Sequence, residues 1–310
     1  MAKIVVSGSL NMDAVAVTPR IPIAGETILG SRFFTTPGGK GANQAYAAAR
    51  LGGDVAMVGR VGDDAFGIQM RNGLADAGCA VEGIRVFPGA SGVAVIYVSE
   101  RGENSIVVVP GANQLLTPGD IALERGLFDG CLAVLLQLET PLETVIAAAR
   151  LAHEQGARVI LDPAPAPSSP LPRELLEAVD ILTPNETEAA ILTGSAHKPL
   201  SPGEAAAIAL KLQALGPPAV IVKLGAQGCL LWDDCDASVL PAPTVTAVDT
   251  TAAGDVFNGA LAVALSEGLT LKQACQFAVQ ASALSVTRMG AQSSIPTRAE
   301  VESFQARRAS

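Results

Sequence analysis

The segment 247–265, AVDTTAAGDVFNGALAVAL, places Asp249 and Asp255 on either side of a run of small residues, just before an apolar helix. A helix start needs one capping side chain, so a second carboxylate is surplus to structure. Backbone N–H groups at 252–254 can surround a developing anion, and Asp255 beside them can accept a hydroxyl proton. Phosphoryl transfer tolerates so weak a base. We expect Asp255 to be ionised at neutral pH because a helix start favours negative charge.

Asp249 suits a separate task. One carboxylate and the carbonyl groups of an irregular loop form a suitable oxygen cage for a cation. The alternative is that the two aspartates are successive helix caps. That alternative is reasonable for Asp249 but explains Asp255 poorly.

The segment TPGGKGANQ, residues 36–44, combines glycines and a lysine ahead of a predicted helix. Exposed N–H groups and one cation can approach a polar or anionic ligand there. It is not a Walker A loop, because Lys40 is followed by glycine and the upstream glycine spacing differs. A plain glycine-rich turn is the alternative, and the presence of Lys40 and Asn43 on the first helical turn favours ligand contact.

The segment GSLNMDA, residues 8–14, follows the first predicted strand, and ligands of open α/β sheets gather beyond the carboxyl ends of strands. It lacks the G-x-G-x-x-G pattern of dinucleotide folds. Asn11 and Asp13 point the same way in an extended chain, and an amide with a carboxylate suits vicinal hydroxyls. Ordinary turn chemistry is the alternative.

Two later segments have the features of a nucleotide site. In TPNETEA, residues 183–189, Asn185 and Glu188 form either a capping box or a pair facing phosphates and the waters of Mg²⁺. VKLGAQGCLL, residues 222–231, predicts a strand, a Gly-x-x-Gly turn and a second strand. This unit either holds a purine and its phosphates or is an ordinary hairpin.

Alternating strands and helices predict a mostly parallel sheet covered on both faces. The predicted inner strands are short, apolar and rich in β-branched residues, as buried parallel strands are; they are 3–8, 54–59, 131–138, 158–162, 180–184 and 219–225. Helical periodicity predicts helices at 40–51, 64–77, 141–155, 204–215, 254–266 and 271–288.

Residues 14–36 and 91–109 break this rhythm, and each predicts an antiparallel hairpin. Together they predict a small sheet projecting from the main layer. A small sheet with an apolar face has to cover something, either a substrate or another subunit. Because no tract or repeat divides the chain, we expect one α/β domain over 1–310.

The 310 residues, 49% of them hydrophobic, can bury a large core. The net charge is −9 and the 21 basic residues are dispersed, which argues against nucleic acid and anionic membranes as partners. No signal segment or apolar membrane span is recognisable, so we expect a cytoplasmic protein.

The cysteines form no C-x-x-C pair and the two histidines are remote from them, so no zinc pattern appears. We expect reduced, mostly buried thiols. The residues concerned are Cys79, Cys131, Cys229, Cys235, Cys275, His153 and His197.

Taken together, these segments resemble the ribokinase family, which also contains adenosine kinase, fructokinase and the B-type phosphofructokinases. The resemblance runs through nearly the whole chain in order: GSLNMD, PIAGET, GGKGANQA, GDDAFG, QLETPLE, DPAPA, TPNETEA, DTTAAGDVFNGAL and TRMGAQSS. It implies a doubly wound three-layer α/β/α sandwich with a β-sheet lid. It also implies ATP-dependent phosphorylation of D-ribose at the 5-hydroxyl.

The resemblance also implies roles for individual residues. Asp255 would be the base, with an anion hole from Ala252, Ala253 and Gly254. The sugar would be held by Asn11, Met12, Asp13, Gly39, Lys40, Gly41, Ala42, Asn43, Glu139 and Asp255. ATP and its Mg²⁺ would contact Asn185, Glu188, Lys223, Leu224, Gly225, Ala226, Gln227, Gly228, Gly254 and Val279. A monovalent cation, K⁺, would lie against Asp249, Thr251, Ser285, Arg288, Gly290 and Ser294.

The resemblance further implies a homodimer formed through the lid. Two positions depart from the family pattern: Lys223 stands where many relatives have Thr, and Val279 where some have His. Both departures bear on nucleotide affinity more than on reaction type. Kinases of the same fold for deoxyribose, fructose or adenosine remain the alternative. The polar trio of Asn11, Asp13 and Lys40 argues against an apolar nucleoside base in the acceptor site.

Overall fold

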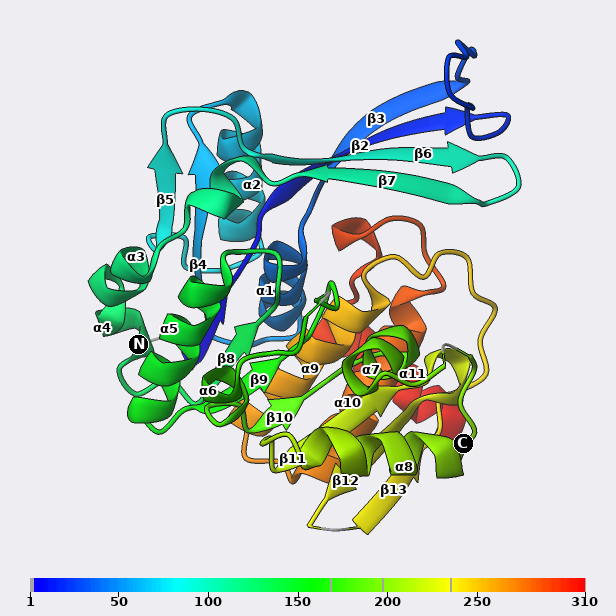
Figure 1. Ribbon diagram of the computed structural model, residues 1–310. Coiled ribbons are helices and arrows are strands. Elements are labelled where there is room, and N and C mark those ends of the chain that lie inside the picture. Colours follow the sequence, from blue (N-terminus) through cyan, green and yellow to red (C-terminus); the bar gives the residue numbers. More distant parts are fainter. Residues whose placement is uncertain (1–2, 168, 197, 235, 310) are drawn as a thin grey trace.

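A nine-stranded sheet runs through the computed structural model, which describes residues 3–167, 169–196, 198–234 and 236–309 (Figure 1). Its strands in spatial order are β13 (Asp236–Leu240), β12 (Cys229–Asp233), β11 (Ala219–Lys223), β10 (Ile181–Leu182), β9 (Arg158–Leu161), β8 (Ala133–Leu136), β1 (Ile4–Ser7), β4 (Val55–Gly62) and β5 (Ile84–Phe87). All neighbours are parallel except at the β11-β12-β13 edge, which is antiparallel.

Helices cover both faces of this sheet because successive strand residues face opposite cores. Ile4 and Val6 pack into one apolar cluster and Val5 into the other, all fully buried. The first cluster is covered by α1 (Lys40–Arg50), α2 (Ala65–Asp76), α9 (Ala253–Ser266), α10 (Leu271–Ser285) and α11 (Arg298–Ala309). The second is covered by α3 (Pro118–Leu123), α4 (Arg125–Phe128), α5 (Leu142–Glu154), α6 (Arg173–Leu176), α7 (Glu186–Thr193) and α8 (Pro202–Gln213).

The predicted three-layer α/β/α fold is therefore confirmed, as is each predicted inner strand and helix. The ends differ: β10 has only two residues, and α10 ends at Ser285, short of 288. Three 3₁₀ turns were not predicted: η1 (Gly111–Leu115), η2 (Gly225–Gln227) and η3 (Gln292–Ser294). Sequence periodicity also missed α3, α4 and α6, which are too short to display a helical repeat, and it missed the longer α11.

A second sheet of four strands projects from the main body as a lid (Figure 1). Its spatial order is β3 (Arg32–Gly38), β2 (Asn11–Thr18), β6 (Gly92–Ser99) and β7 (Asn104–Val109). Both predicted hairpins are antiparallel, but they join through the parallel pair β2 and β6, which was not expected. Strand β2 also begins at Asn11, not near 14, so the lid starts within the predicted sugar-binding segment.

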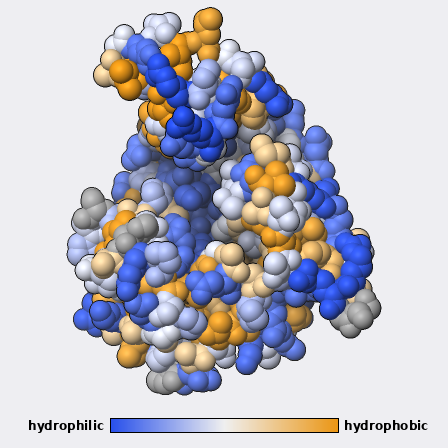
Figure 2. All heavy atoms as spheres, turned by 90° about the vertical axis from the view of Figure 1, so that its right-hand side faces the viewer, coloured by the Kyte–Doolittle hydropathy of each residue, from blue (hydrophilic) through white to orange (hydrophobic). Residues whose placement is uncertain are grey.

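Figure 2 shows the molecule hollowed beneath the lid, with mostly hydrophilic surface visible inside the hollow. No helix in the described parts of the chain has the length and apolarity that crossing a membrane requires. Cys79, Cys131, Cys229 and Cys275 are buried free thiols, as expected. Cys235 and His197 lie outside the described residues.

A close helix crossing sets the position of the candidate site. Helix α9 passes α1 at Gly259, where an added Cβ would lie 2.8 Å from Ala47 Cβ and 2.9 Å from Ala48 N. Only glycine allows the two backbones to approach this closely. The crossing brings the first turns of α1 and α9 together, so that side chains of one can hydrogen-bond to those of the other.

The crossing can be tested with one substitution at two helical glycines. Gly259→Ala should lower the free energy of unfolding by about 1–3 kcal/mol, because the methyl group overpacks the crossing. Gly73→Ala is the matched control: it lies in α2 with nothing within 4 Å of the added Cβ. It should raise stability by about 0.5–1 kcal/mol, since alanine favours a helix. Chemical denaturation measures both, and a stabilised Gly259→Ala protein would contradict the tight crossing.

Candidate active site

Asp255 lies in the first turn of α9, only 6% exposed, and is held by two amide donors from α1. Asn43 Nδ2 donates to Asp255 Oδ2 at 3.1 Å, and Gln44 Nε2 donates to Oδ1 at 3.1 Å. The side-chain oxygen of Asn43 has no partner among the described residues, although it is buried. One carboxylate is thus fixed in orientation, beside an acceptor that remains available to a hydroxyl group.

The start of α9 is built differently from a capped helix. Ala252 adopts the left-handed conformation, with φ 59°, and no side chain caps the helix. The Ala253 N–H donates to Thr250 O at 3.2 Å, so it is not free, contrary to our expectation for this part of the anion hole. The Gly254 and Asp255 N–H groups have no acceptor within the described ranges. These two are the amides positioned to meet an anion.

Asp255 is ionised at neutral pH, as expected, but the helix end is not the main influence on its pKa. Burial is the largest influence and raises the pKa to about 6; Asp162 adds to the rise, whereas Lys40 and the Asn43 and Gln44 hydrogen bonds oppose it. The helix end therefore does not dominate. The group is still mostly ionised at pH 7, about one unit above this pKa, and its proton affinity is better matched to general-base work than that of an ordinary aspartate.

A second polar group gathers where the lid joins the sheet. Burial, followed by the charges of Glu139 and Asp255, raises the pKa of Asp13 to about 7. Glu139 accepts hydrogen bonds from Ser9 Oγ at 2.5 Å and from the Lys40 N–H at 3.1 Å. The structure therefore brings the predicted sugar-binding carboxylates, Asp13 and Glu139, near the predicted base, Asp255. These residues are far apart in the sequence.

Asn11 belongs to the same region, where its side-chain oxygen accepts from Asn113 Nδ2 at 2.8 Å. Gly39 and Gly41 allow the start of α1 to approach this strand end. A Cβ on Gly39, where φ is 88°, would lie 2.6 Å from Asn11 N, and a Cβ on Gly41 would lie 2.6 Å from Ser9 N. These glycines shape the site through backbone packing.

Two predicted sugar-binding side chains do not face the site. Met12 is fully buried in the apolar core, because alternation along β2 points it away from Asn11 and Asp13. Ala42 is 1% exposed in the same cluster. Met12, which was expected among the sugar-holding residues, therefore has its side chain in the core.

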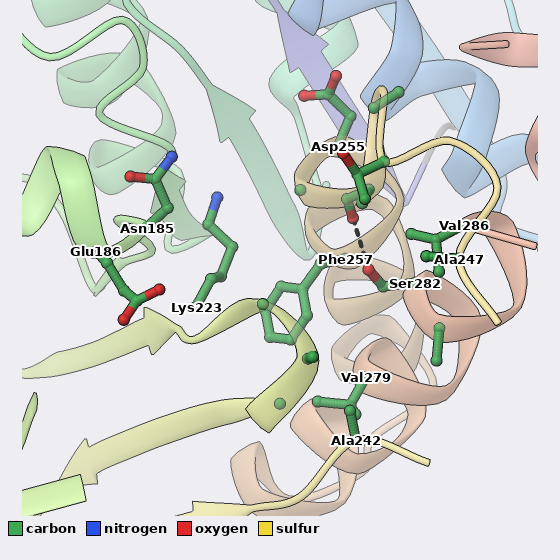
Figure 3. Close-up of a pocket in the computed structure, with 18 of the residues that line it drawn as sticks. Asn185, Glu186, Lys223, Ala242, Ala247, Asp255, Phe257, Val279, Ser282 and Val286 are labelled. Atoms are coloured by element: carbon green, nitrogen blue, oxygen red, sulfur yellow. Dashed lines mark hydrogen bonds between the residues drawn. The ribbon is translucent and has the colours of Figure 1, made fainter. Parts of the chain in front are cut away.

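A cavity of about 690 Å³ opens between α7, the turn after β11, the start of α9 and the C-terminal half of α10. Figure 3 shows Asn185 and Lys223 on one side, Asp255 and Ser282 on the other, and Phe257 and Val279 on the apolar floor. Most predicted nucleotide-binding positions line it: Asn185, Glu188, Lys223, Gly225, Ala226, Gly228, Gly254 and Val279. Leu224 instead packs in the core and Gln227 is exposed outside the cavity.

Asn185 and Glu188 form the capping box that their spacing predicted. Asn185 Oδ1 accepts from the Glu188 N–H at 2.8 Å, and Glu188 Oε2 accepts from the Asn185 N–H at 2.8 Å. The same side chains line the cavity, so the capping interpretation is confirmed while their contact with a ligand stays a prediction. Burial is the main cause that raises the pKa of Glu188.

Sequence reasoning missed the residues that connect these groups. Gln44 Nε2 donates to Asp162 Oδ2 at 3.0 Å as well as to Asp255, and Gln44 Oε1 accepts from Gln137 Nε2 at 2.7 Å. Asp162 follows β9 and Gln137 follows β8. The rule that ligands gather beyond the carboxyl ends of parallel strands, which singled out 8–14, applies equally to both positions.

The loop that was predicted to hold a cation brings Thr251 and Gly290 to Asp249. Asp249 Oδ1 accepts from the Thr251 N–H at 2.9 Å and Oγ1 at 2.6 Å, and Oδ2 accepts from the Gly290 N–H at 2.8 Å. Burial alone would raise the pKa of Asp249, but these hydrogen bonds lower it overall. Three of about four lone pairs are used, which leaves one for a cation. The side chains of Ser285, Arg288 and Ser294 bond elsewhere, to Ser282 O, Glu300 and Ala291 O.

The two aspartates of the opening segment should respond oppositely to removal of their charge. The pKa of Asp255 is about 6 in the folded protein, compared with 3.8 for an exposed aspartate. Its ionisation therefore lowers the free energy of unfolding as pH rises from about 4 through 6. Asp255→Asn should therefore stabilise the protein at pH 7.5, by up to about 3 kcal/mol, since each pKa unit corresponds to about 1.4 kcal/mol. The gain should shrink toward pH 4, and thermal unfolding at several pH values measures it.

Asp249→Asn is the matched control. Its carboxylate has a lowered pKa and accepts three hydrogen bonds, so the amide should destabilise the protein at pH 7.5. If Asp255→Asn and Asp249→Asn shift the unfolding temperature in the same direction, burial does not determine the pKa of Asp255.

Comparisons with known proteins agree with this architecture. A model of the pfkB family carbohydrate kinases matches residues 1–298. The chain is 44% identical to the ribokinase of Bacillus subtilis, covering 97% of this chain and 99% of that protein. It is 39% identical to a deoxyribokinase of Salmonella typhi, over 95% of each.

A solved structure of Arabidopsis thaliana ribokinase complexed with ribose and ATP is similar to this chain over 98% of both, with 36% identity and a TM-score of 0.88. The resemblance drawn from the sequence motifs is confirmed. The chain belongs to the pfkB family of carbohydrate kinases.

Proposed function

We propose that the protein transfers the γ-phosphoryl group of ATP to the 5-hydroxyl of D-ribose. The observation that carries this proposal is the placement of Asp255. It lies at the amide-bearing start of α9, on the wall of the large cavity, with the carboxylates of the lid root nearby. Full-length similarity to ribokinases supports the choice of acceptor.

The sugar lies between the lid root and the start of α1. Asp13 and Glu139 accept hydrogen bonds from its hydroxyls, Asn11 and Lys40 donate to its oxygens, and the unpartnered Asn43 Oδ1 accepts one more. The glycine backbones at 39 and 41 leave room for the ring. A pentose bound in this way presents one alcohol to Asp255.

Asp255 then accepts the proton of the attacking hydroxyl. The new bond forms between the sugar oxygen and the γ-phosphorus while the bond to the β-γ bridging oxygen breaks, with the leaving ADP in line. The Gly254 and Asp255 N–H groups stabilise the charge of the phosphoryl oxygens as they cross. Asn43 and Gln44 hold the carboxylate oriented, so that little rearrangement is needed at the moment of transfer.

ATP occupies the 690 Å³ cavity, with its base against the apolar floor near Phe257 and Val279 and its phosphates near Asn185 and Gly254. The carboxylates of Glu186 and Glu188 on the cavity wall are suited to hold Mg²⁺ through water. When bound, Mg²⁺ neutralises part of the phosphate charge. K⁺ would lie against Asp249 and the carbonyl groups of 285–294, fixing the loop that leads into α9.

The second candidate is a kinase for deoxyribose. It is favoured by the similarity to a deoxyribokinase, at 39% identity and equally long coverage. The two sugars differ by one hydroxyl, and a site that pairs this hydroxyl with buried polar groups rejects the analogue lacking it.

The test is ADP release measured over a panel of ribose, deoxyribose, fructose and adenosine, with K⁺ and Na⁺ compared. Ribose should give the highest kcat/KM, and K⁺ should support a higher rate than Na⁺. Asp255→Asn should lower kcat by about 10²-fold or more while changing the affinity for sugar only modestly, because a positioned base is lost.

The controls separate the parts of this proposal. Asp249→Asn should keep the base and lose the preference for K⁺. Turnover of ribose no faster than that of fructose and adenosine rules out the substrate assignment. A near-normal rate in Asp255→Asn would assign the base to another residue.

We also propose that the lid forms a homodimer interface. Strand β7 exposes four consecutive apolar side chains, Ile106, Val107, Val108 and Val109, each about half accessible, and Phe33 on β3 is 68% exposed. Exposed apolar residues on both faces of an edge strand are typical of a surface that another molecule covers on each side. The bound sugar lies against one face, and a second lid covers the other.

Two pairs of substitutions test this interface. Ile106→Asp with Val108→Asp, and Val107→Asp with Val109→Asp, place the same charge on opposite faces of β7. One pair should give a monomer in light scattering at micromolar concentration while the other leaves the dimer intact. A monomeric, fully active wild-type protein would refute the interface.

A further inference from the structure

Lys223 forms a buried ion pair on the cavity wall. Its Nζ lies 2.9 Å from Asp162 Oδ1, and the two side chains are 12% and 3% exposed. Lys223 is the last residue of β11, and Figure 3 shows its side chain extending into the space between Asn185 and Asp255. An added Cβ on Gly254 would lie 3.3 Å from this Nζ. The ammonium group is therefore next to the start of α9.

The ammonium group, although paired with Asp162, lies beside the positive end of α9. A helix start carries partial positive charge, which repels a cation placed beside it. The free Gly254 and Asp255 N–H groups concentrate that charge at the same spot. An anion between the ammonium group and the helix start would satisfy both, and the terminal phosphate of ATP is the anion that the proposed reaction brings there.

Asp162 is equipped to keep its position when Lys223 leaves. Its second oxygen, Oδ2, accepts from Gln44 Nε2 at 3.0 Å, and Gln44 is in turn held by Gln137 and Asp255. A lysine side chain has a flexible four-carbon stem, whereas this glutamine is fully buried. The mobile partner is the cation, and the carboxylate is the fixed one.

A structural role alone explains this pair poorly. Burying two charges costs nearly as much as their attraction returns, so a buried ion pair is weak evidence for a contribution to stability. Most of the apolar core lies on the two faces of the sheet, but this pair lies at the carboxyl edge, on the cavity wall. An exchangeable cation is useful there.

We propose that Lys223 is a catalytic residue that exchanges partners, pairing with Asp162 in the empty site and with the terminal phosphate of ATP during transfer. This inference rests on the proposed phosphoryl transfer. Lys223 donates hydrogen bonds to the non-bridging oxygens of the phosphoryl group during transfer. The P–O bond to ADP breaks, the P–O bond to the sugar forms, and the proton goes to Asp255. The exchange makes the site selective for a nucleoside triphosphate.

A binding series without sugar tests the exchange. The ligands are adenosine, ADP and a non-hydrolysable ATP analogue, measured by calorimetry at fixed Mg²⁺. Lys223→Met should weaken binding of the analogue by about 10-fold or more, weaken ADP less, and leave adenosine unchanged, because a charge-assisted hydrogen bond is lost. Lys198→Met is the matched control, since it removes the lysine of an exposed ion pair with Glu204 outside the cavity. It should change none of the three affinities.

Two further variants keep the test decisive if Lys223→Met folds poorly. Lys223→Arg retains the charge and should retain most of the selectivity for triphosphate. Asp162→Asn frees the ammonium group and should leave the affinity for the ATP analogue unchanged or tighter. Equal losses for adenosine, ADP and the analogue, or equal weakening in Asp162→Asn and Lys223→Met, would show a structural pair and overturn the proposal.

Kinetics add a readout that folding alone would not produce. Lys223→Met should lower kcat and raise KM for ATP while the KM for sugar stays within about threefold, because the cation acts on the phosphoryl group. The binding series uses no sugar, so an intact series with no ribose turnover would reject only the substrate assignment. A flat series with normal ribose turnover would reject only the role of Lys223.

Discussion

The buried carboxylate of Asp255 is the group on which the rest of the site depends. Its orientation comes from amide donors on α1, which reach it only because α1 and α9 cross closely at Gly259. Burial raises its proton affinity, and the free N–H groups at the helix start lie beside it. One packing contact between two helices thus sets both the geometry and the basicity of the proposed base.

The site gathers several carboxylates whose negative charges repel one another. The charges of Glu139 and Asp255 raise the pKa of Asp13, and Asp162 raises that of Asp255. Burial alone would lower the pKa of Lys40, but the charges of Asp255, Asp162, Glu139 and Glu188 raise it overall. This frustration is what a binding site is expected to carry: stability is lost in the free protein and recovered when a substrate separates the charges.

Sequence patterns predicted the features that are determined within a single segment of the chain. Strand and helix periodicity, the capping box at Asn185 and the site at the start of α9 all belong to this kind. Contacts between distant segments could not be predicted in this way. Gln44 binds Asp162, which is 118 positions away, and β2 pairs with β6 in parallel. The burial that raises the pKa of Asp255 was not foreseen for the same reason, because it comes from other elements.

Strand β2 has two ends with different duties. Its first residues, Asn11 and Asp13, face the proposed acceptor, and its far end runs into the exposed lid that we propose as the subunit interface. Because the strand is continuous, a displacement of its exposed end would move Asn11 and Asp13 as well. The proposed acceptor site and the proposed subunit interface therefore lie on one continuous strand.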